Sequence, residues 1–428
     1  MKAISPLIFF IIVYLATSIV AGDFYKVPIT VAFMLTAIFA ITVSKGHFNN
    51  RIRKFNRGAG RKNLMTMLWI FVLAGAFANS AEKMGCVDSF VNLTLAVVPA
   101  DALLAGLFLA SALISLSIGT SVGTIVALTP IAVGIASATG LSVPMLTGIV
   151  VGGSFFGDNL SFISDTTVVA TQSQGCSMSD KFKTNIYIAL PAALVVMFIY
   201  AIIGNNVTLP SEPQVDSILK IVPYLVVLIV AIVGVNVFIV LTIGILLTGL
   251  LNLFMPSMNG EGELPLYAWF GNMGEGISGM GELIIVSLLA GGILELIRAN
   301  GGIRFIINKV IHHIDSPRKA ELSIATLVSL VDVCTANNTI AIITVSGIAK
   351  EIATRFNLDP RRVASILDTF SCIMQGIIPY GAQLLMAAAL AHCNPLDIIP
   401  HLYYTYALLI MALLSIVFRF PRKKMHNA

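Results

Sequence analysis

The sequence predicts an all-α, polytopic membrane protein with about fourteen transmembrane spans, some of them broken, arranged as two inverted-topology repeats. Three observations support this prediction: the composition, the length of the apolar runs and a similarity between the two halves of the chain. Of the 428 residues, 57% are hydrophobic and only 11% are charged, whereas a soluble protein carries about 25% charged residues. The apolar runs are continuous and do not alternate with polar residues, which excludes a transmembrane β-barrel.

The apolar runs have the length that membrane-spanning helices need. A hydrocarbon core about 30 Å thick requires about 17–25 apolar residues per helix. In chain order, the first four predicted spans are residues 5–21, 27–44, 64–84 and 101–118. The fifth follows a break at 119–124 and ends at 138, and the sixth begins at 143. The later predicted spans are 186–203, two within 218–255, 280–297, 320–333, 337–352, 363–390 (broken) and 398–418.

The charges of the loops predict the orientation in the membrane. The segment 45–62 contains several bases and no acid, and the segment 298–319 and the tail are also basic. The segment 204–217 at the midpoint contains acids and no base. By the positive-inside rule, both termini are cytoplasmic. The net charge of +5 therefore relates to membrane orientation, and no nucleic-acid partner is expected.

The two halves, residues 1–210 and 211–428, resemble each other. The run Leu73–Ala76 of the first half recurs as Leu289–Gly292 in the second. Other matches at nearly the same offset pair Gly85 with Gly301, Thr120 with Thr335 and Thr124 with Thr339. Each unit contains about seven spans, and an odd number places the second copy upside down. Inverted repeats with broken helices that face each other are typical of secondary transporters.

The most unusual stretch is residues 152–167, which follows an apolar run beginning at Val143. It contains carboxylates, an amide, hydroxyls and three glycines, and such groups in a membrane must line a cavity or bind something. The glycines favour an unwound segment, and unwinding would add free carbonyls to the side-chain oxygens. All-oxygen surroundings suit Na⁺, or H⁺ at a carboxylate.

Asp158 is the predicted main site for the cation and the proton. A lone carboxylate inside a membrane is costly, so either a proton or a cation neutralises it, and competition between the two is sufficient for antiport. The predicted supporting residues are Asn159, Ser161, Ser164, Asp165 and Thr166. An alternative for two of them is that Ser164 caps a half-helix and Asp165 interacts with its dipole.

A second polar break at Gly119–Thr124 has a repeat mate at Asp332–Thr339. Ordinary packing of small residues is an alternative explanation for the first of these segments. Its mate is more polar and is predicted to contribute Asp332, Thr335, Asn337 and Asn338 to the same site. Residues 368–381 form the mate of the Asp158 stretch, with Gln375 near the place of Asp158. The predicted helix-break residues are Gly119, Thr120, Gly123, Thr124, Gly157, Gln375, Gly376 and Pro379.

Residues Gly157–Thr167 resemble the GD(K/N)xSPxSDTT signature of NhaC-type Na⁺/H⁺ antiporters, within the ion transporter superfamily, and Gly119–Thr124 resembles that family's GTSxGT break. Two positions depart from the pattern: Phe162 stands in place of a common proline and Val122 in place of a common tryptophan. The resemblance implies an exchanger of Na⁺ and H⁺ in the bacterial cytoplasmic membrane. Relatives in this superfamily also move organic anions or amino acids.

Two alternative functions compete with this interpretation. One is a Na⁺- or H⁺-coupled exchanger of a small organic acid or amino acid, although no arginine lies inside a predicted span to bind a dicarboxylate. The other is an intramembrane aspartyl protease, which typically needs a GxGD motif, whereas Phe155 takes the first glycine position. No enzyme activity and no cofactor are expected. The five cysteines form no CxxC pair and His312–His313 lies in a basic loop. The expected partners are the lipid bilayer, Na⁺, H⁺ and a second copy in a homodimer.

Overall fold

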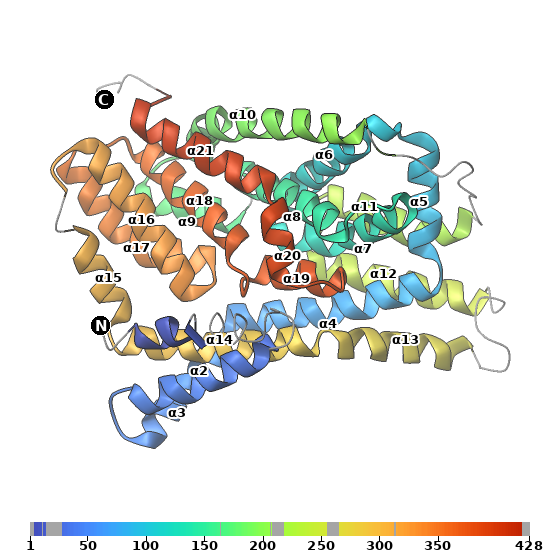
Figure 1. Ribbon diagram of the computed structural model, residues 1–428, viewed down its shortest axis with the longest axis horizontal. Coiled ribbons are helices and arrows are strands. Elements are labelled where there is room, and N and C mark those ends of the chain that lie inside the picture. The colour runs from blue at the N-terminus through green and yellow to red at the C-terminus, as the bar shows by residue number, and fades with distance from the viewer. Residues whose placement is uncertain are drawn as a thin grey trace.

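The protein is described here by a computed structural model covering residues 4–10, 12–13, 28–162, 164–205, 207, 218–254, 265–311 and 314–421. Throughout these ranges the regular elements are helices (Figure 1). Part of the first predicted span, much of the midpoint segment, His312–His313 and the end of the basic tail lie outside them.

Up to residue 205, the described helices include α2 (Ile29–Val43), α3 (Phe48–Ala59), α4 (Lys62–Lys83), α5 (Cys86–Val97), α6 (Ala100–Ile118), α7 (Ser121–Thr139), α8 (Val143–Leu160), α9 (Asp165–Gln174) and α10 (Met178–Gly204). From residue 218 onward, they are α11 (Ile218–Ile232), α12 (Val237–Phe254), α13 (Pro265–Gly279), α14 (Gly281–Ala299), α15 (Gly302–Ile311), α16 (Pro317–Thr335), α17 (Asn338–Arg355), α18 (Pro360–Ile377), α19 (Ala382–Leu390), α20 (Pro395–Ile398), η2 (Ile399–His401) and α21 (Tyr403–Phe418).

Many of these helices are suited to a membrane. In the described part of the chain, seven helical segments are long and apolar enough to span it, or up to eight if the bent pair that ends in α21 is one span. Four shorter apolar helices accompany them. The polytopic helical class is therefore confirmed, whereas the number of fourteen crossings stays a prediction.

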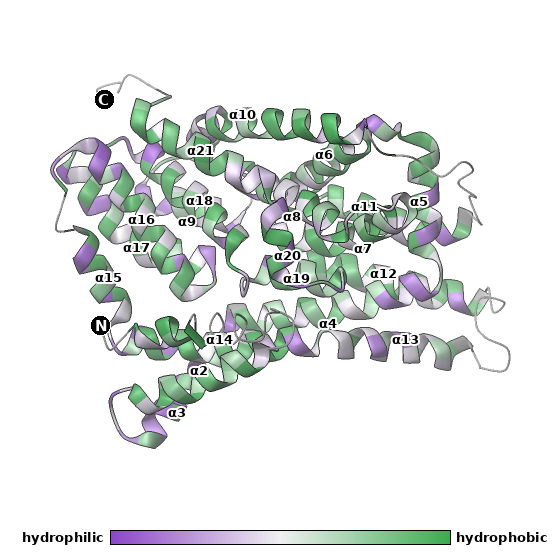
Figure 2. Ribbon diagram, in the orientation of Figure 1, coloured by the Kyte–Doolittle hydropathy of each residue, from purple (hydrophilic) through white to green (hydrophobic). Residues whose placement is uncertain are grey.

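The outer surface of α10 shows what surrounds the fold. Leu194, Val195, Phe198 and Ile202 are exposed on this helix, which is predominantly hydrophobic (Figure 2). Exposed apolar side chains over several turns are expected where a helix faces lipid acyl chains.

The helix boundaries recur at a constant spacing. Helix α6 starts at Ala100 and α16 starts at Pro317. The same number of residues separates the start of α7 from that of α17, the start of α8 from that of α18, and the start of α9 from that of α19. At this offset, the predicted match of Thr120 with Thr335 is out of register. Thr120 corresponds instead to Asn337, since each is the residue before its helix.

The corresponding helices also exchange partners. α9 packs on α17 and α19 packs on α7, while α10 packs on α18 and α21 on α8. In the same way α13 packs on α4 and α3 on α14, as Figure 1 shows along the lower side of the molecule. Each half therefore buries its helices against the other half, which supports the predicted repeat.

Two glycine contacts explain the sequence match at Leu73–Ala76. A Cβ on Gly75 would collide with the carbonyl of Gly276 where α4 crosses α13, and a Cβ on Gly58 would collide with the carbonyl of Gly291 where α3 crosses α14. Gly75 and Gly291 occupy the same position in the two matching runs. The matching segments thus mark two equivalent crossings at which the backbones approach closely.

Candidate cation-binding site

Four short interruptions separate successive helices of the two halves. One separates α6 from α7, where Gly119 has a φ of +72°, and its counterpart separates α16 from α17, where Ala336 has a φ of +46°. The second pair separates α8 from α9 and α18 from α19. Gly119, Thr120 and Pro379 lie within or beside these breaks, as predicted.

The remaining predicted break residues lie within helices. They are Gly123, Thr124, Gly157, Gln375 and Gly376. The prediction that the chain unwinds at the glycines is therefore wrong for α8, which continues to Leu160 before the break.

The glycines of α8 serve close packing. A Cβ on Gly157 would lie 2.5 Å from the amide nitrogen of Leu116, and a Cβ on Gly153 would lie 2.6 Å from the carbonyl oxygen of Phe108. Both contacts are with α6, so these glycines let the two backbones touch. The Ser115 hydroxyl strengthens this contact by donating to the carbonyl oxygen of Ser154 over 2.5 Å.

Asp158 lies at the end of α8 with 4% of its surface exposed. Its Oδ1 accepts a hydrogen bond from the Ser164 hydroxyl at 2.5 Å, and its Oδ2 accepts one from the Ser121 hydroxyl at 3.0 Å. Ser121 is the first residue of α7 and Ser164 directly precedes α9. Two helix N-termini therefore meet at this carboxylate, where their dipoles favour negative charge.

The residues after the break have separate roles. Ser164 occupies the N-cap position of α9, but its side chain makes no capping bond and instead contacts both Asp158 and the Thr166 hydroxyl, at 2.9 Å from the latter. Asp165 is exposed in the first turn of α9, as the dipole alternative expects. Ser161 is buried and donates to the carbonyl of Leu116.

A chain of amide side chains connects Asp158 to the second half. Gln383 donates from Nε2 to the Ser121 hydroxyl at 3.0 Å, and Gln375 donates to Gln383 Oε1 at 2.8 Å. Gln375 Nε2 also lies 3.3 Å from the carbonyl oxygen of Ala336 in the opposite break. Gln375 stands at the position of α18 that Asp158 holds in α8, so the carboxylate of one repeat corresponds to an amide in the other.

A buried ion pair lies near Asn159, the residue that follows Asp158. Lys181 Nζ is 2.5 Å from Asp368 Oδ2, with side-chain exposures of 1% and 0%. The ammonium also donates to the carbonyl oxygen of Asn159 and, at 2.7 Å, to the Thr167 hydroxyl. The side chain of Asn159 donates to Asp368 at 3.2 Å. Asn159 therefore connects the Asp158 site to a second charged cluster.

Asp332 lies apart from these hydrogen bonds. It is fully buried, and neither carboxylate oxygen has a hydrogen-bond partner of normal geometry among the described residues, although the Asn337 N–H interacts with it more weakly. Asn337 caps α17 through Ile340 N–H, Thr335 donates to the carbonyl of Asn337, and Asn338 accepts from the neighbouring N–H. These four residues thus support the second break, and none has a described hydrogen bond with Asp158.

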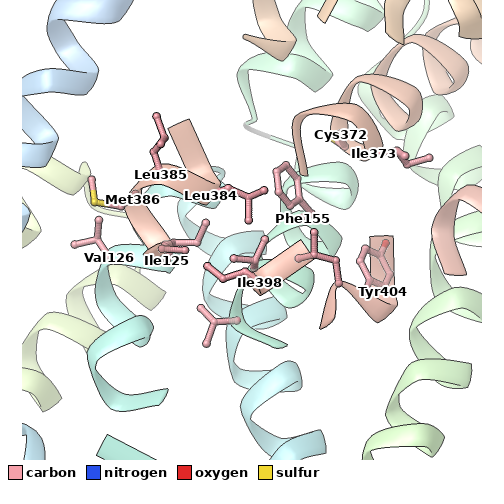
Figure 3. Close-up of a cluster of buried hydrophobic side chains, with 14 of the residues drawn as sticks. Ile125, Val126, Phe155, Cys372, Ile373, Leu384, Leu385, Met386, Ile398 and Tyr404 are labelled. Carbon is pink, nitrogen blue, oxygen red and sulfur yellow. The ribbon is translucent and has the colours of Figure 1, made fainter. Parts of the chain in front are cut away.

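Apolar side chains from both halves form a buried cluster on the helices that carry the polar residues. Figure 3 shows Ile125 of α7 and Phe155 of α8 near Leu384 of α19 and Tyr404 of α21, all of which are buried. Phe155 precedes Asp158 by about one helical turn. Because Asp158 is itself buried, its electrostatic interactions are stronger than they would be in bulk water.

Three important residues were missed or misplaced in the sequence. Lys181 precedes the predicted span 186–203, whereas in the structure it lies inside α10. Asp368 belongs to the predicted repeat mate but not to the predicted site residues, although a carboxylate within the apolar run 363–390 is a sufficient signal. Gln383 is the second residue of α19, and Thr166 is the second residue of α9. The repeat offset seen in the structure therefore makes Gln383 the counterpart of Thr166, a predicted site residue.

A multi-pass helical fold with two paired breaks and buried carboxylates at their contact defines a membrane protein of the secondary transporter class. The model of the Na⁺/H⁺ antiporter family matches residues 1–205 and 207–421. The chain therefore belongs to the Na⁺/H⁺ antiporter family, which is a family of transporters and not of enzymes.

Individual relatives align over most of the chain. The Na(+)/H(+) antiporter NhaC of Bacillus subtilis is 26% identical over 399 residues, covering 85% of this chain and 86% of the relative. A protein of the same name from Alkalihalophilus pseudofirmus is 21% identical over 92% of this chain and 89% of its own length. The Malate-2H(+)/Na(+)-lactate antiporter of Bacillus subtilis is also 21% identical, over 83% of this chain and 81% of the relative.

Proposed function

We propose that this protein exchanges Na⁺ for H⁺ across the bacterial cytoplasmic membrane and that Asp158 binds both ions in turn. The observation that carries the proposal is the setting of Asp158: a buried carboxylate whose described hydrogen-bond donors are both hydroxyls. The family match and the relatives named Na(+)/H(+) antiporters support it.

The hydroxyls suit both forms of the site. A serine or threonine hydroxyl is a donor and an acceptor, and its hydrogen rotates to fit its partner. When Asp158 is ionised and no cation is present, Ser121 and Ser164 donate to it. When Na⁺ binds, the hydroxyls of Ser164 and Thr166 turn their lone pairs toward the ion, and the carboxylate supplies the negative charge. A proton on Asp158 excludes the cation, so the two ions compete.

The two helix N-termini set the balance of this competition. Their dipoles stabilise the ionised carboxylate, which opposes the preference of a buried acid for its neutral form. Without them the proton would hold the site too firmly for Na⁺ to displace it. The breaks before α7 and α9 are therefore part of the exchange chemistry.

The test is Na⁺-dependent dequenching of a pH-sensitive dye in everted membrane vesicles. Asp158→Asn is expected to reduce it to the level of vesicles without the protein, because the amide neither binds a proton in this range nor attracts Na⁺. The matched variant is Asp165→Asn, beyond the break, whose side chain is exposed and which should retain exchange. Normal exchange by Asp158→Asn would refute the assignment.

A second cargo is favoured by one observation, the buried cation Lys181, because a buried ammonium can bind a carboxylate substrate. The relative named Malate-2H(+)/Na(+)-lactate antiporter makes this candidate worth testing. In this structure, however, the ammonium already contacts Asp368, Asn159 and Thr167, so its three hydrogens have partners. Uptake of labelled malate and lactate by proteoliposomes, with and without a Na⁺ gradient, distinguishes this cargo from Na⁺/H⁺ exchange.

A further inference from the structure

We propose that the ammonium group of Lys181 acts as a tethered cation that permanently occupies a second cation cage, so that this cage takes up no Na⁺. The cage is formed by the carbonyl oxygen of Asn159, the hydroxyl of Thr167 and the carboxylate of Asp368. The inference rests on the proposed function only in taking Na⁺ as the cargo.

The ligands of the ammonium are all oxygens. Lys181 Nζ has three hydrogens, and it contacts a backbone carbonyl, a hydroxyl and a carboxylate. Carbonyl, hydroxyl and carboxylate oxygens are the groups that hold hard cations such as Na⁺. The chemistry of this position is therefore that of a metal-ion site with an amino group in the place of the ion.

The cage also has unused oxygens. Asp368 Oδ1 and Asn185 Oδ1 have no hydrogen-bond partner in the described structure, although both residues are completely buried. The amide of Asn185 lies against the cage, because its Nδ2 is 3.2 Å from the carbonyl oxygen of Asn159 and 3.4 Å from Asp368 Oδ2. A free ion of higher coordination number can use the second oxygen of Asp368, whereas the ammonium already has a partner for each of its three hydrogens.

The ammonium is covalently attached to the protein, and this attachment determines whether the cation in the cage can be exchanged. Asp158 and Asp368 are both buried near Asn159, and two ionised carboxylates would attract two cations. Because the cation at Asp368 belongs to the side chain of Lys181, it cannot leave with the cargo. Replacing this side chain with an apolar one of similar length should leave the cage vacant for Na⁺.

The experiment counts bound Na⁺ directly. Equilibrium binding of radioactive Na⁺ to purified protein, with choline chloride as the background salt, is measured for the unmodified protein and for Lys181→Met. The expected result is one additional Na⁺ per chain in Lys181→Met. The double variant Lys181→Met/Asp368→Asn should return to the original count, because it lacks the carboxylate. Lys183→Met, which changes an exposed lysine of the same helix, should not change the count.

An unchanged count in Lys181→Met would overturn the proposal and leave Lys181 as a structural ion pair. Where Lys181→Met cannot be isolated in choline, recovery of monodisperse protein in NaCl alone supports the cage, since Na⁺ then replaces the ammonium. Failure in both salts counts against it. The count does not depend on transport, so absence of Na⁺/H⁺ exchange by the unmodified protein would refute the proposed function and not this inference.

Discussion

The Asp158 carboxylate receives its two hydrogen bonds from residues that stand at the N-termini of two different helices. The sequence identified this aspartate because a carboxylate within an apolar run has few structural explanations. It left the role of Ser164 open between capping and ligation, and the structure favours contact with Asp158 because the serine makes no capping bond. Lys181 was missed because a lysine at the end of an apolar run usually extends toward water, whereas here Asp368 holds it inside.

Ser164 provides a test at the scale of one hydroxyl. Ser164→Ala removes a donor to the ionised carboxylate and an oxygen ligand for Na⁺. A hydrogen bond to a charged group contributes about 1.5–3 kcal/mol, so the Na⁺ concentration that gives half-maximal exchange should rise about ten-fold or more. The maximal rate should change less. Dequenching over a range of Na⁺ concentrations in everted vesicles measures both.

The control for this variant is Ser117→Ala in α6. The hydroxyl of Ser117 is exposed and donates to the carbonyl of Leu113 one turn earlier, so its removal should leave the Na⁺ dependence unchanged. A similar Na⁺ dependence in Ser164→Ala and in the unmodified protein would remove this hydroxyl from the site.

At the scale of helices, the positions of the breaks could be predicted approximately from the sequence, but the prediction that the glycines of α8 unwind the helix is wrong. Glycine disfavours helices, but it also lets two helices approach closely, and the sequence alone does not separate these effects. In α8 the contact with α6 prevails, so the helix continues through Gly157 and the break falls after Leu160. The repeat mate located the opposite break at Pro379, whereas Gln375, predicted near the place of Asp158, lies inside α18 at the position that Asp158 holds in α8.

Gly157→Ala tests whether close packing of α6 and α8 is required. The added methyl group would lie 2.5 Å from both the Leu116 nitrogen and the Ser115 Cβ, and overpacking of this kind costs about 1–3 kcal/mol. Gly106→Ala in α6 is the control, because a Cβ there meets nothing within 4 Å. That change should stabilise the helix by about 0.5–1 kcal/mol. The midpoint temperature of thermal unfolding in detergent should therefore fall in Gly157→Ala and rise in Gly106→Ala. Equal midpoints in the two variants would contradict the packing role.

At the scale of the whole molecule, corresponding helices carry opposite charge. The helix α3 contains Arg51, Arg53, Lys54 and Arg57 and no acid, whereas its counterpart α13 contains Glu275 and no base. The helix α15 contains Arg304 and Lys309, whereas its counterpart α5 contains Asp88 and no base. Bases gather on the cytoplasmic side of membrane proteins. We therefore expect equivalent positions of the two repeats to lie on opposite sides of the membrane, as an inverted repeat requires.

An inverted repeat predicts the sidedness of two points on the chain. A fusion after residue 210 follows an odd number of crossings, and a fusion after residue 428 follows twice that number. We expect alkaline phosphatase, which is active only outside the cytoplasm, to be active at the first point and inactive at the second. Green fluorescent protein fused at the same points should give the reverse result, which controls for expression. Repeats of parallel orientation would place both points on the cytoplasmic side, and phosphatase activity would then be absent at each. The predicted difference depends only on whether the number of crossings per repeat is odd, so it tests the inverted architecture without requiring the total number of spans.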